Sequence, residues 1–246
     1  MDKDKEKKYE LTEENMTLRD GIVLHRIKAL RRISPPCGPM VEKGDIGGWV
    51  ETEDNLSQDG GAWIEGEAEV YGEARVSENA RVCGTAVVCE RARVSGEAHI
   101  FGSARVSGSA EISGKAMVYG EARVSENARV CGSTQVCGSA WVVGLAHIFG
   151  EAMVYGEARV SGNARVFGEA VVCERARVFG EAEVGDMARV NGGARVSGQA
   201  HIFGTAWVSG EAWVGDKARV GGSAEVDGEA RVCGNAEAIG DERIYC

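Results

Sequence analysis

The chain has 246 residues and a formal net charge of −10, and its composition is rich in glycine and poor in aromatic residues, with 35 glycines and 6% Phe, Trp and Tyr. This composition is unusual for a globular enzyme and makes internal repeats the first feature to seek. The acidic balance opposes non-specific attraction to nucleic acid, although it leaves room for a local basic surface. No apolar stretch of secretory-signal or membrane-span length follows the charged start MDKDKEKKYE. We therefore expect a cytoplasmic protein without a membrane partner.

Residues 1–61 carry no regular repeat and predict a charged disordered tail (1–8) followed by an N-terminal cap (9–61). In the cap, KYELTEENMTL and GIVLHRIKAL flank the turn-forming Arg19-Asp20-Gly21 and predict a β-hairpin. The segment SPPCGP predicts a rigid connection to a degenerate first coil. Since the end of a stack of repeats exposes its core, we expect residues 9–61 to cover that end.

From Ala62 to Ala236 an alanine recurs at every sixth position, thirty times, with Thr134 as the one replacement. Val or Ile follows two residues later and a glycine two residues after that, so the unit is A-x-[VI]-x-G-x. The small-x-aliphatic alternation predicts a short strand with one buried face, and Gly-x predicts a corner. The glycine is replaced only by acids, at Glu78, Glu90, Glu126, Glu174, Asp186 and Asp216.

So short a strand buries nothing alone, and the units must stack at roughly 4.8 Å per coil. Three units make an 18-residue coil, and residues 62–240 make about ten coils. The predicted fold is all-β, a single-stranded left-handed parallel β-helix with an N-terminal hairpin cap and a short C-terminal end at 241–246. A right-handed β-helix of the bactofilin kind, which has less regular corners, is the alternative.

Two stretches, Val184-Gly-Asp-Met-Ala188 and Val214-Gly-Asp-Lys-Ala218, match an aliphatic residue followed four positions later by a small one. In this the chain resembles the hexapeptide-repeat, or isoleucine-patch, superfamily of left-handed β-helices. The segment GDIGGWVETEDNLSQDGGAW resembles the entry segment of uncharacterised prophage-encoded hexapeptide-repeat proteins of enteric bacteria, loosely labelled transferase-like. The resemblance spans nearly the whole chain and implies a bacterial host, but no defined function.

The segment YGEARVSENARVCG occurs at residues 71–84 and again, unchanged, at 119–132. The shift of 48 residues is not a multiple of 18, so the two copies lie on different faces. A catalytic constellation would not survive this rotation, whereas a scaffold lengthened by duplication would tolerate it. The duplication therefore favours a structural or binding role.

Within each unit the residue before the Val and the residue after it point outward, which gives two columns of side chains on each of three faces. The first face, which starts at Trp63, has an apolar middle. A monomer rarely leaves such a patch in water, so we predict self-association as a dimer or trimer, with a partner site or ordinary surface as alternatives. The candidate interface residues are Phe101, Met117, Tyr119, Cys137, Met153, Tyr155, Val171 and Cys173.

The second face carries six arginines interrupted by two tryptophans, with serines beside them. Arginines stacked on neighbouring strands repel one another. Either corner glutamates such as Glu121, Glu157, Glu181 and Glu211 interleave with them, or an anionic ligand does, and both explanations stay open. Such a ligand would be an anionic small molecule, a nucleotide, a glycan or a host protein. The candidate ligand-binding residues are Arg105, Arg123, Trp141, Arg159, Arg177, Arg195, Trp213 and Arg231.

The third face mixes arginine, glutamate and histidine, which indicates a solvated surface. His99, His147 and His201 share the context AHIFG or its near equivalent, which favours duplication over a tuned catalytic base. His147 and His201 lie three coils apart, roughly 14 Å at the strand spacing, too far to share a zinc ion. Similar distances separate three cysteines of one outer column, which we read as reduced thiols: Cys83, Cys137 and Cys173.

No phosphate-binding loop, dinucleotide fingerprint or nucleophile elbow is recognisable, and no loop interrupts the repeat. We therefore expect no catalytic residue, no metal and no cofactor. The predicted function is a non-catalytic, prophage-type scaffold or binding protein that self-associates and presents its arginine-rich face to a partner or anionic ligand. The alternative is a hexapeptide-family acyltransferase that uses acyl-coenzyme A at a site between subunits.

Overall fold

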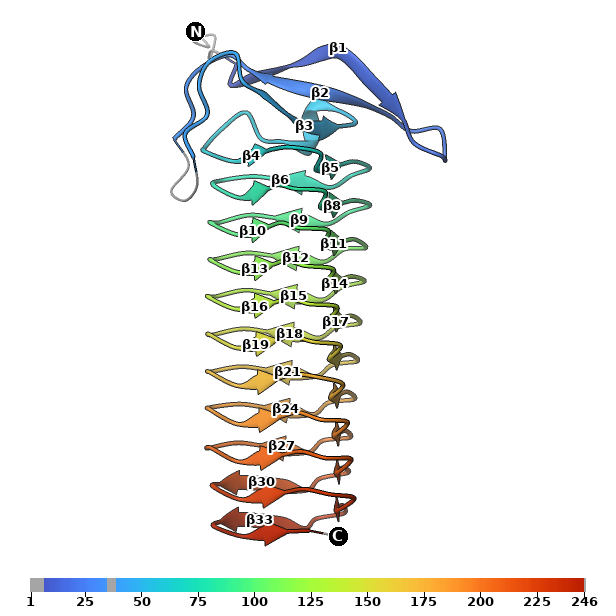
Figure 1. The fold of residues 1–246 in the computed structure, drawn as a ribbon, viewed down its shortest axis with the longest axis vertical. Helices are drawn as coiled ribbons and strands as arrows, with labels where there is room; N and C mark the ends of the chain where they lie inside the picture. The colour runs from blue at the N-terminus through green and yellow to red at the C-terminus, as the bar shows by residue number, and fades with distance from the viewer. Residues whose placement is uncertain (1–6, 35–38, 246) are drawn as a thin grey trace, which may run out of the picture.

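A computed structural model describes residues 7–34 and 39–245 of the chain, which form a straight rod with a cap at one end (Figure 1). The cap begins with strands β1 (Tyr9–Thr17) and β2 (Val23–Ala29), which pair antiparallel as the predicted hairpin. Strand β3 (Ile46–Val50) pairs antiparallel with β2 and parallel with β5, so it joins the hairpin to the first coil. A single 3-10 turn, η1 (Glu53–Asn55), follows it.

The rod consists of three parallel sheets, and each coil contributes one strand to each sheet. The first sheet has 11 strands: β4 (Trp63–Ile64), β7 (Arg81–Val82), β10 (His99–Ile100), β13 (Met117–Val118), β16 (Gln135–Val136), β19 (Met153–Val154), β22 (Val171–Val172), β25 (Arg189–Val190), β28 (Trp207–Val208), β31 (Glu225–Val226) and β34 (Arg243–Ile244).

The second sheet has 13 strands, because β1, β2 and β3 extend it at the cap end. Its remaining strands are β5 (Glu69–Val70), β8 (Val87–Val88), β11 (Arg105–Val106), β14 (Arg123–Val124), β17 (Trp141–Val142), β20 (Arg159–Val160), β23 (Arg177–Val178), β26 (Arg195–Val196), β29 (Trp213–Val214) and β32 (Arg231–Val232). The third sheet has 10 strands: β6 (Arg75–Val76), β9 (Arg93–Val94), β12 (Glu111–Ile112), β15 (Arg129–Val130), β18 (His147–Ile148), β21 (Arg165–Val166), β24 (Glu183–Val184), β27 (His201–Ile202), β30 (Arg219–Gly222) and β33 (Glu237–Gly240).

This architecture confirms the predicted all-β parallel β-solenoid, with one strand and one corner per hexapeptide. The left-handed sense of its winding stays a prediction. The inward positions are shielded from solvent up to Val232, as at Ala158 and Val160, both 0% exposed, and Ala236 of the last coil is exposed. The buried residues form one cluster that continues into the cap through Tyr9, Ile27 and Val41. A single core therefore runs from the hairpin to the last coils.

The acids that replace glycine at corners adopt the same left-handed backbone as the glycines around them. Glu174 has φ 58° and Asp216 has φ 56°, close to φ 72° at Gly156. This conformation is unfavourable for a residue with a Cβ atom. The carboxylates of five of the six acids offset the cost, since each of the five accepts a hydrogen bond from the backbone N–H of the corner glycine one coil further on. The pairs are Glu78–Gly96, Glu90–Gly108, Glu174–Gly192, Asp186–Gly204 and Asp216–Gly234, at 2.7–2.9 Å.

The cap covers the first coils more closely than we predicted. Lys7 and Lys8, expected in a disordered tail, contact the cap instead: Lys7 pairs with Glu53 at 2.9 Å, and the buried Lys8 ammonium donates to the carbonyl of Ala62. Trp63 and Arg81 were expected to point into solvent, but both are 2% exposed. Arg81 donates to the carbonyl of Pro39 and to the carboxylate of Glu65. The predicted rigid connection SPPCGP lies mostly outside the described residues, which omit 35–38.

Candidate functional site: the outer faces of the solenoid

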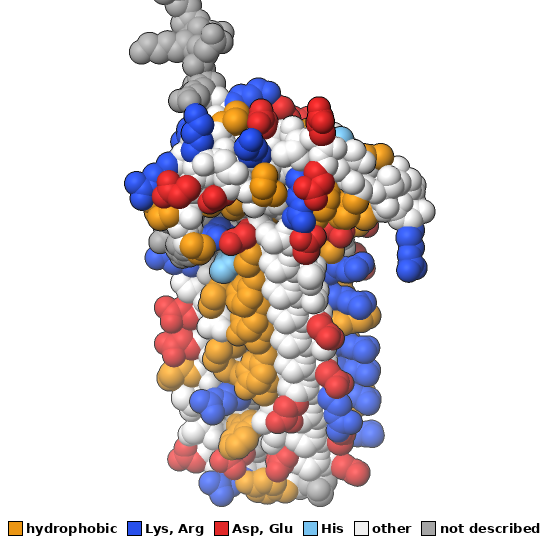
Figure 2. Space-filling model, turned by 45° about the horizontal axis from the view of Figure 1, so that its top comes forward, with side chains coloured by type: hydrophobic (Ala, Val, Ile, Leu, Met, Phe, Trp, Pro, Cys, Tyr) orange, Lys and Arg blue, Asp and Glu red, His pale blue; other side chains and the backbone are white. Residues whose placement is uncertain are grey.

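The arginines of the second sheet form a continuous ladder on its outer surface. Strands β11 to β32 pair in parallel register, so each outward residue lies directly over the equivalent residue of the next coil. We call this set the arginine column: Arg105, Arg123, Trp141, Arg159, Arg177, Arg195, Trp213 and Arg231. All eight side chains are exposed, and a column of basic side chains runs along one edge of the rod in Figure 2. The structure thus places the predicted ligand-binding residues on one surface.

The six arginines of this column form no ion pair with any carboxylate among the described residues. Three of the corner glutamates that were expected to interleave with them are engaged elsewhere. Glu121 accepts from the Ser139 hydroxyl at 3.4 Å, and Glu181 accepts from the Gln199 amide at 2.8 Å. Glu211 lies 3.9 Å from Arg175, which is a corner residue. These three glutamates therefore form no ion pair with the column, and neutralisation by corner glutamates stays a prediction.

The third sheet has the same strand-to-strand geometry, but three of its outward arginines form ion pairs. Arg129 pairs with Glu111 at 3.2 Å, Arg165 with Glu183 at 2.9 Å, and Arg219 with Glu237 at 3.1 Å, each across one strand-to-strand step. His201 also approaches Glu183, at 3.5 Å. A carboxylate one coil away can therefore pair with an outward arginine in this fold. The arginine column lacks such partners because all eight of its outward positions are arginine or tryptophan.

The two tryptophans separate the charges within the column. The guanidiniums of Arg123 and Arg159 lie 5.1 and 5.2 Å from the ring centroid of Trp141, and that of Arg231 lies 5.7 Å from Trp213. Cation–π contacts of this kind contribute about 0.5–1 kcal/mol at exposed sites. The indole of Trp213 also donates to the hydroxyl of Ser197 at 2.9 Å. The tryptophans thus contact three guanidiniums whose N–H groups form no hydrogen bond or ion pair with another described residue.

The apolar residues of the first sheet also come together as predicted. We call this set the apolar strip: Phe101, Met117, Tyr119, Cys137, Met153, Tyr155, Val171 and Cys173. The rings of Phe101 and Tyr119 stack at 4.7 Å, and the Tyr119 hydroxyl donates to Gln135 at 3.1 Å. Because the side chains pack on one another along the rod, most are half-buried, and Tyr155 is 39% exposed. Figure 2 shows a hydrophobic band on this face, beside a neutral corner.

The histidines and cysteines make local pairs that the sequence did not reveal. Cys83 Sγ lies 3.2 Å from His99 Nε2, and Cys131 Sγ lies 3.4 Å from His147 Nε2. Burial lowers the pKa of His99, helped by the positive charge of Arg81, and burial raises the pKa of the Cys83 thiol. Both shifts favour the neutral forms, so this pair lacks the thiolate that a nucleophile requires. Within the described residues no three His, Cys, Asp or Glu side chains converge on a possible metal position.

Known proteins support the repeat architecture and no particular activity. A family model described as YdcK beta solenoid repeat matches residues 122–138 and 158–174, two segments of the rod. No curated protein matches the chain. The hexapeptide superfamily and the prophage origin therefore rest on the sequence resemblance alone. None of the described residues forms a helix that is both long and apolar enough to cross a membrane.

Proposed function

We propose that this protein is a non-catalytic β-solenoid scaffold that binds an extended anion along the arginine column. The observation that carries the proposal is the absence of ion pairs for six aligned guanidiniums, in a fold whose third sheet pairs three of its own arginines. From the resemblance alone, we assign the scaffold to the prophage type of a bacterial host. The acyltransferase alternative stays a prediction, because a site between subunits is not tested by one chain.

The spacing of the column defines the kind of anion that would fit. Eight neighbouring strands at roughly 4.8 Å place its two ends roughly 34 Å apart. Like charges at this spacing repel one another, and an anion with regularly repeated sulfate, phosphate or carboxylate groups would remove that repulsion. Both faces of Trp141 are approached by guanidiniums, which leaves no ring face open for stacking a nucleobase. The contacts therefore favour recognition of the charged groups rather than of bases.

The test compares the native chain with Arg159→Ala/Arg177→Ala for binding to fluorescently labelled heparin oligosaccharide and labelled oligo(dT). We expect the native chain to bind at least one probe, with an affinity that falls as salt is added. Each lost charge-assisted contact removes about 1.5–3 kcal/mol, so the double variant should bind at least tenfold more weakly. The control is Arg165→Ala/Arg219→Ala, which removes the same charge from the ion-paired third sheet. No binding of either probe by the native chain, or equal loss in both variants, would contradict the proposal.

The second part of the proposal is association between two copies through the apolar strip. The strip extends over five coils of a straight sheet, and no side chain within it carries a charge at neutral pH. Burial raises the pKa of Cys173, and the contact with Cys173 raises the pKa of Tyr155, so both groups stay neutral. A flat, uncharged surface suits an isologous contact, in which the same strip of a second copy covers it.

A further inference from the structure

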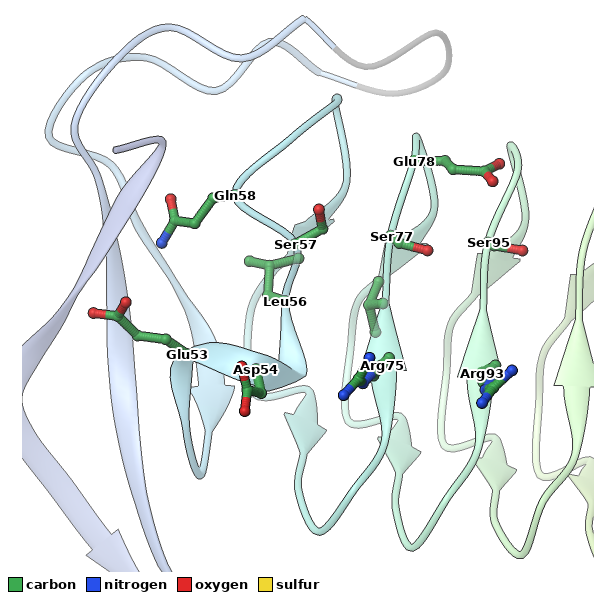
Figure 3. Close-up of a pocket in the computed structure, with 11 residues that line it drawn as sticks. Glu53, Asp54, Leu56, Ser57, Gln58, Arg75, Ser77, Glu78, Arg93 and Ser95 are labelled. Carbon is green, nitrogen blue, oxygen red and sulfur yellow. The ribbon is translucent and has the colours of Figure 1, made fainter. Parts of the chain in front are cut away.

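A polar hollow lies on the third sheet, where the cap meets the first coils (Figure 3). It has a volume of about 670 Å³, within the range of small-molecule sites. Its floor is formed by strands β6 and β9, and η1 forms the wall on the cap side. Arg75 and Arg93 lie side by side on the two strands, and a column of three serine hydroxyls runs beside them: Ser57, Ser77 and Ser95.

The hollow exists because the first coil departs from the 18-residue period of the repeat. Leu56 occupies the inward position beside Val76, so Asn55 stands where later coils carry an outward arginine. Asn55 is buried: its amide donates to the carbonyls of Gly72 and Ala74. Its side-chain carbonyl oxygen accepts from the backbone N–H groups of Glu51 and Thr52, which come directly before η1. The outer surface of this coil is therefore left without a side chain at that position, and the space is open to a ligand.

Two guanidiniums and two serine hydroxyls that line the hollow have no side-chain partner among the described residues. Arg75 and Arg93 form no ion pair, and the hydroxyls of Ser77 and Ser95 form no side-chain hydrogen bond. Glu111, the next outward residue beyond Arg93, turns to Arg129 at 3.2 Å instead.

Two of the acids nearby are already engaged. Glu53 pairs with Lys7 at 2.9 Å, and the Glu78 carboxylate accepts from the Gly96 N–H at 2.7 Å. Asp54 is the remaining carboxylate of the wall. The groups that no described residue engages are thus two guanidiniums, hydroxyls and one carboxylate. Because the hydrogen bond leaves the charge of Glu78 in place, the two guanidiniums and Lys7 balance the three carboxylates of the hollow.

We infer that this hollow binds a small phosphorylated molecule that also carries hydroxyl groups. The planar guanidiniums of Arg75 and Arg93 each present paired N–H donors that match a phosphate, which such groups bind in bidentate fashion. The serine hydroxyls and the Asp54 carboxylate then supply acceptors and donors for the hydroxylated part of the ligand.

An adjoining hollow of about 350 Å³ shares Arg75, Arg93 and Asp54 and adds Arg91, so a third guanidinium borders the same region. The site lies on another sheet than the arginine column, and its residues are not part of that proposal. Either inference can therefore fail while the other stands.

The experiment is isothermal titration of the full chain at low salt with glucose 6-phosphate, adenosine 5′-monophosphate, glucose and inorganic phosphate. We expect at least one of the two phosphorylated compounds to bind, and to bind at least tenfold more tightly than inorganic phosphate or glucose. Arg75→Gln/Arg93→Gln should weaken that binding at least tenfold. The matched control is Arg129→Gln/Arg165→Gln, which changes two arginines of the same column that have carboxylate partners and should leave binding unchanged.

Three results would overturn the inference: no heat from either phosphorylated compound at millimolar concentration, binding that survives Arg75→Gln/Arg93→Gln, or inorganic phosphate that binds as tightly as the organic phosphates. Circular dichroism checks that each variant is folded. If the arginine variant does not fold, Ser77→Ala/Ser95→Ala replaces it, because these half-buried hydroxyls carry no structural hydrogen bond. The serine variant should bind the organic phosphate several-fold more weakly, and unchanged binding would count against the site.

Discussion

At the scale of single residues, the corner glycine of the repeat is replaced only by acids, and most of their carboxylates form a hydrogen bond that offsets the unfavourable backbone conformation. Glycine is suited to the corner because φ near 70° is open to it. Only Glu and Asp replace it, and in five cases their carboxylates bind the next corner's N–H, a donor that points away from the strand ladder. The acid thus satisfies a backbone group that the parallel sheets leave unpaired. This explains why the substitutions are acidic rather than random.

The corner at Glu174 allows a direct test of this compensation. Glu174→Ala keeps the left-handed strain and removes the 2.9 Å hydrogen bond to Gly192, so we expect the free energy of unfolding to fall by about 1 kcal/mol. Glu174→Gly removes the same bond but also relieves about 1 kcal/mol of backbone strain, so its stability should stay close to native. Urea denaturation followed by circular dichroism measures both. An alanine variant as stable as the glycine variant would refute the role of the carboxylate.

At the scale of the elements, the cap is fixed to the solenoid by polar groups that reach into its first coil. The Tyr9 hydroxyl lies 2.8 Å from the carbonyls of both Glu53 and Leu56, and Gln58 accepts from the backbone N–H of Lys8. The Lys8 side chain is fully buried and donates to Ala62. Burial lowers the pKa of Lys8 to about 8, and the charge of Arg31 acts in the same direction, while Asp59 opposes it. Keeping this ammonium charged in the folded state therefore lowers the free energy of unfolding.

That cost gives the second prediction, for Lys8→Met. At pH 7 both folded and unfolded chains keep the Lys8 proton, so the full penalty of the buried charge is present. A depression from 10.5 to about 8 corresponds to about 3 kcal/mol, from which the lost hydrogen bond to Ala62 subtracts about 1 kcal/mol. We expect Lys8→Met to be more stable by about 2 kcal/mol at pH 7.

The pH dependence of this difference has a definite sign. Between pH 8 and 10.5 the folded chain releases the Lys8 proton before the unfolded chain does, so the native protein gains stability with rising pH. The advantage of Lys8→Met should therefore shrink through this window. Melting temperatures of both proteins, measured from pH 7 to 10.5, provide the comparison. A native protein more stable than the variant at pH 7 would show that the lysine stabilises the cap.

The regular elements were predictable from the sequence, and the contacts at their ends were not. A strict six-residue period fixes which residues point inward, so Val160 and Arg159 were assigned correctly to core and surface. The same period placed the members of the arginine column and the apolar strip on their sheets. The cap has no period, so the burial of Trp63 and Arg81 and the hollow beside Asn55 depend on tertiary contacts that no repeat encodes. The period gave no signal of this hollow, because the position 18 residues before Arg75 is Ser57 rather than Asn55.

At the scale of the whole molecule, the outer surfaces of the three sheets differ in charge and polarity. The third sheet pairs three of its outward arginines with carboxylates, the arginine column of the second sheet forms no such pair among the described residues, and the apolar strip of the first sheet carries no charged side chain. The outward residues of one sheet stack only on the outward residues of the same sheet in the neighbouring coils, so they can change without disturbing the other two sheets. A rod built in this way can engage different partners on different sides. The cap limits the first sheet at one end, where it covers Trp63 and Arg81.

The third prediction concerns the association of two copies through the apolar strip, tested with Met117→Glu/Tyr155→Glu. Both side chains face outward from the first sheet, on strand β13 and just after strand β19, so the core and the strand ladder should be unaffected. Two carboxylates in a contact that excludes water would lack partners, and burying them costs several kcal/mol. We expect the native chain to sediment and scatter light as a dimer, and the variant to have the mass of a monomer with an unchanged circular dichroism spectrum. The control is Leu145→Glu, which introduces a carboxylate at the corner between the second and third sheets, where Leu145 is 61% exposed, and should keep the native mass. A native chain that is monomeric at micromolar concentration, or a double variant with the native mass, would mean that the strip is ordinary surface that the stacking of its own side chains keeps half-buried.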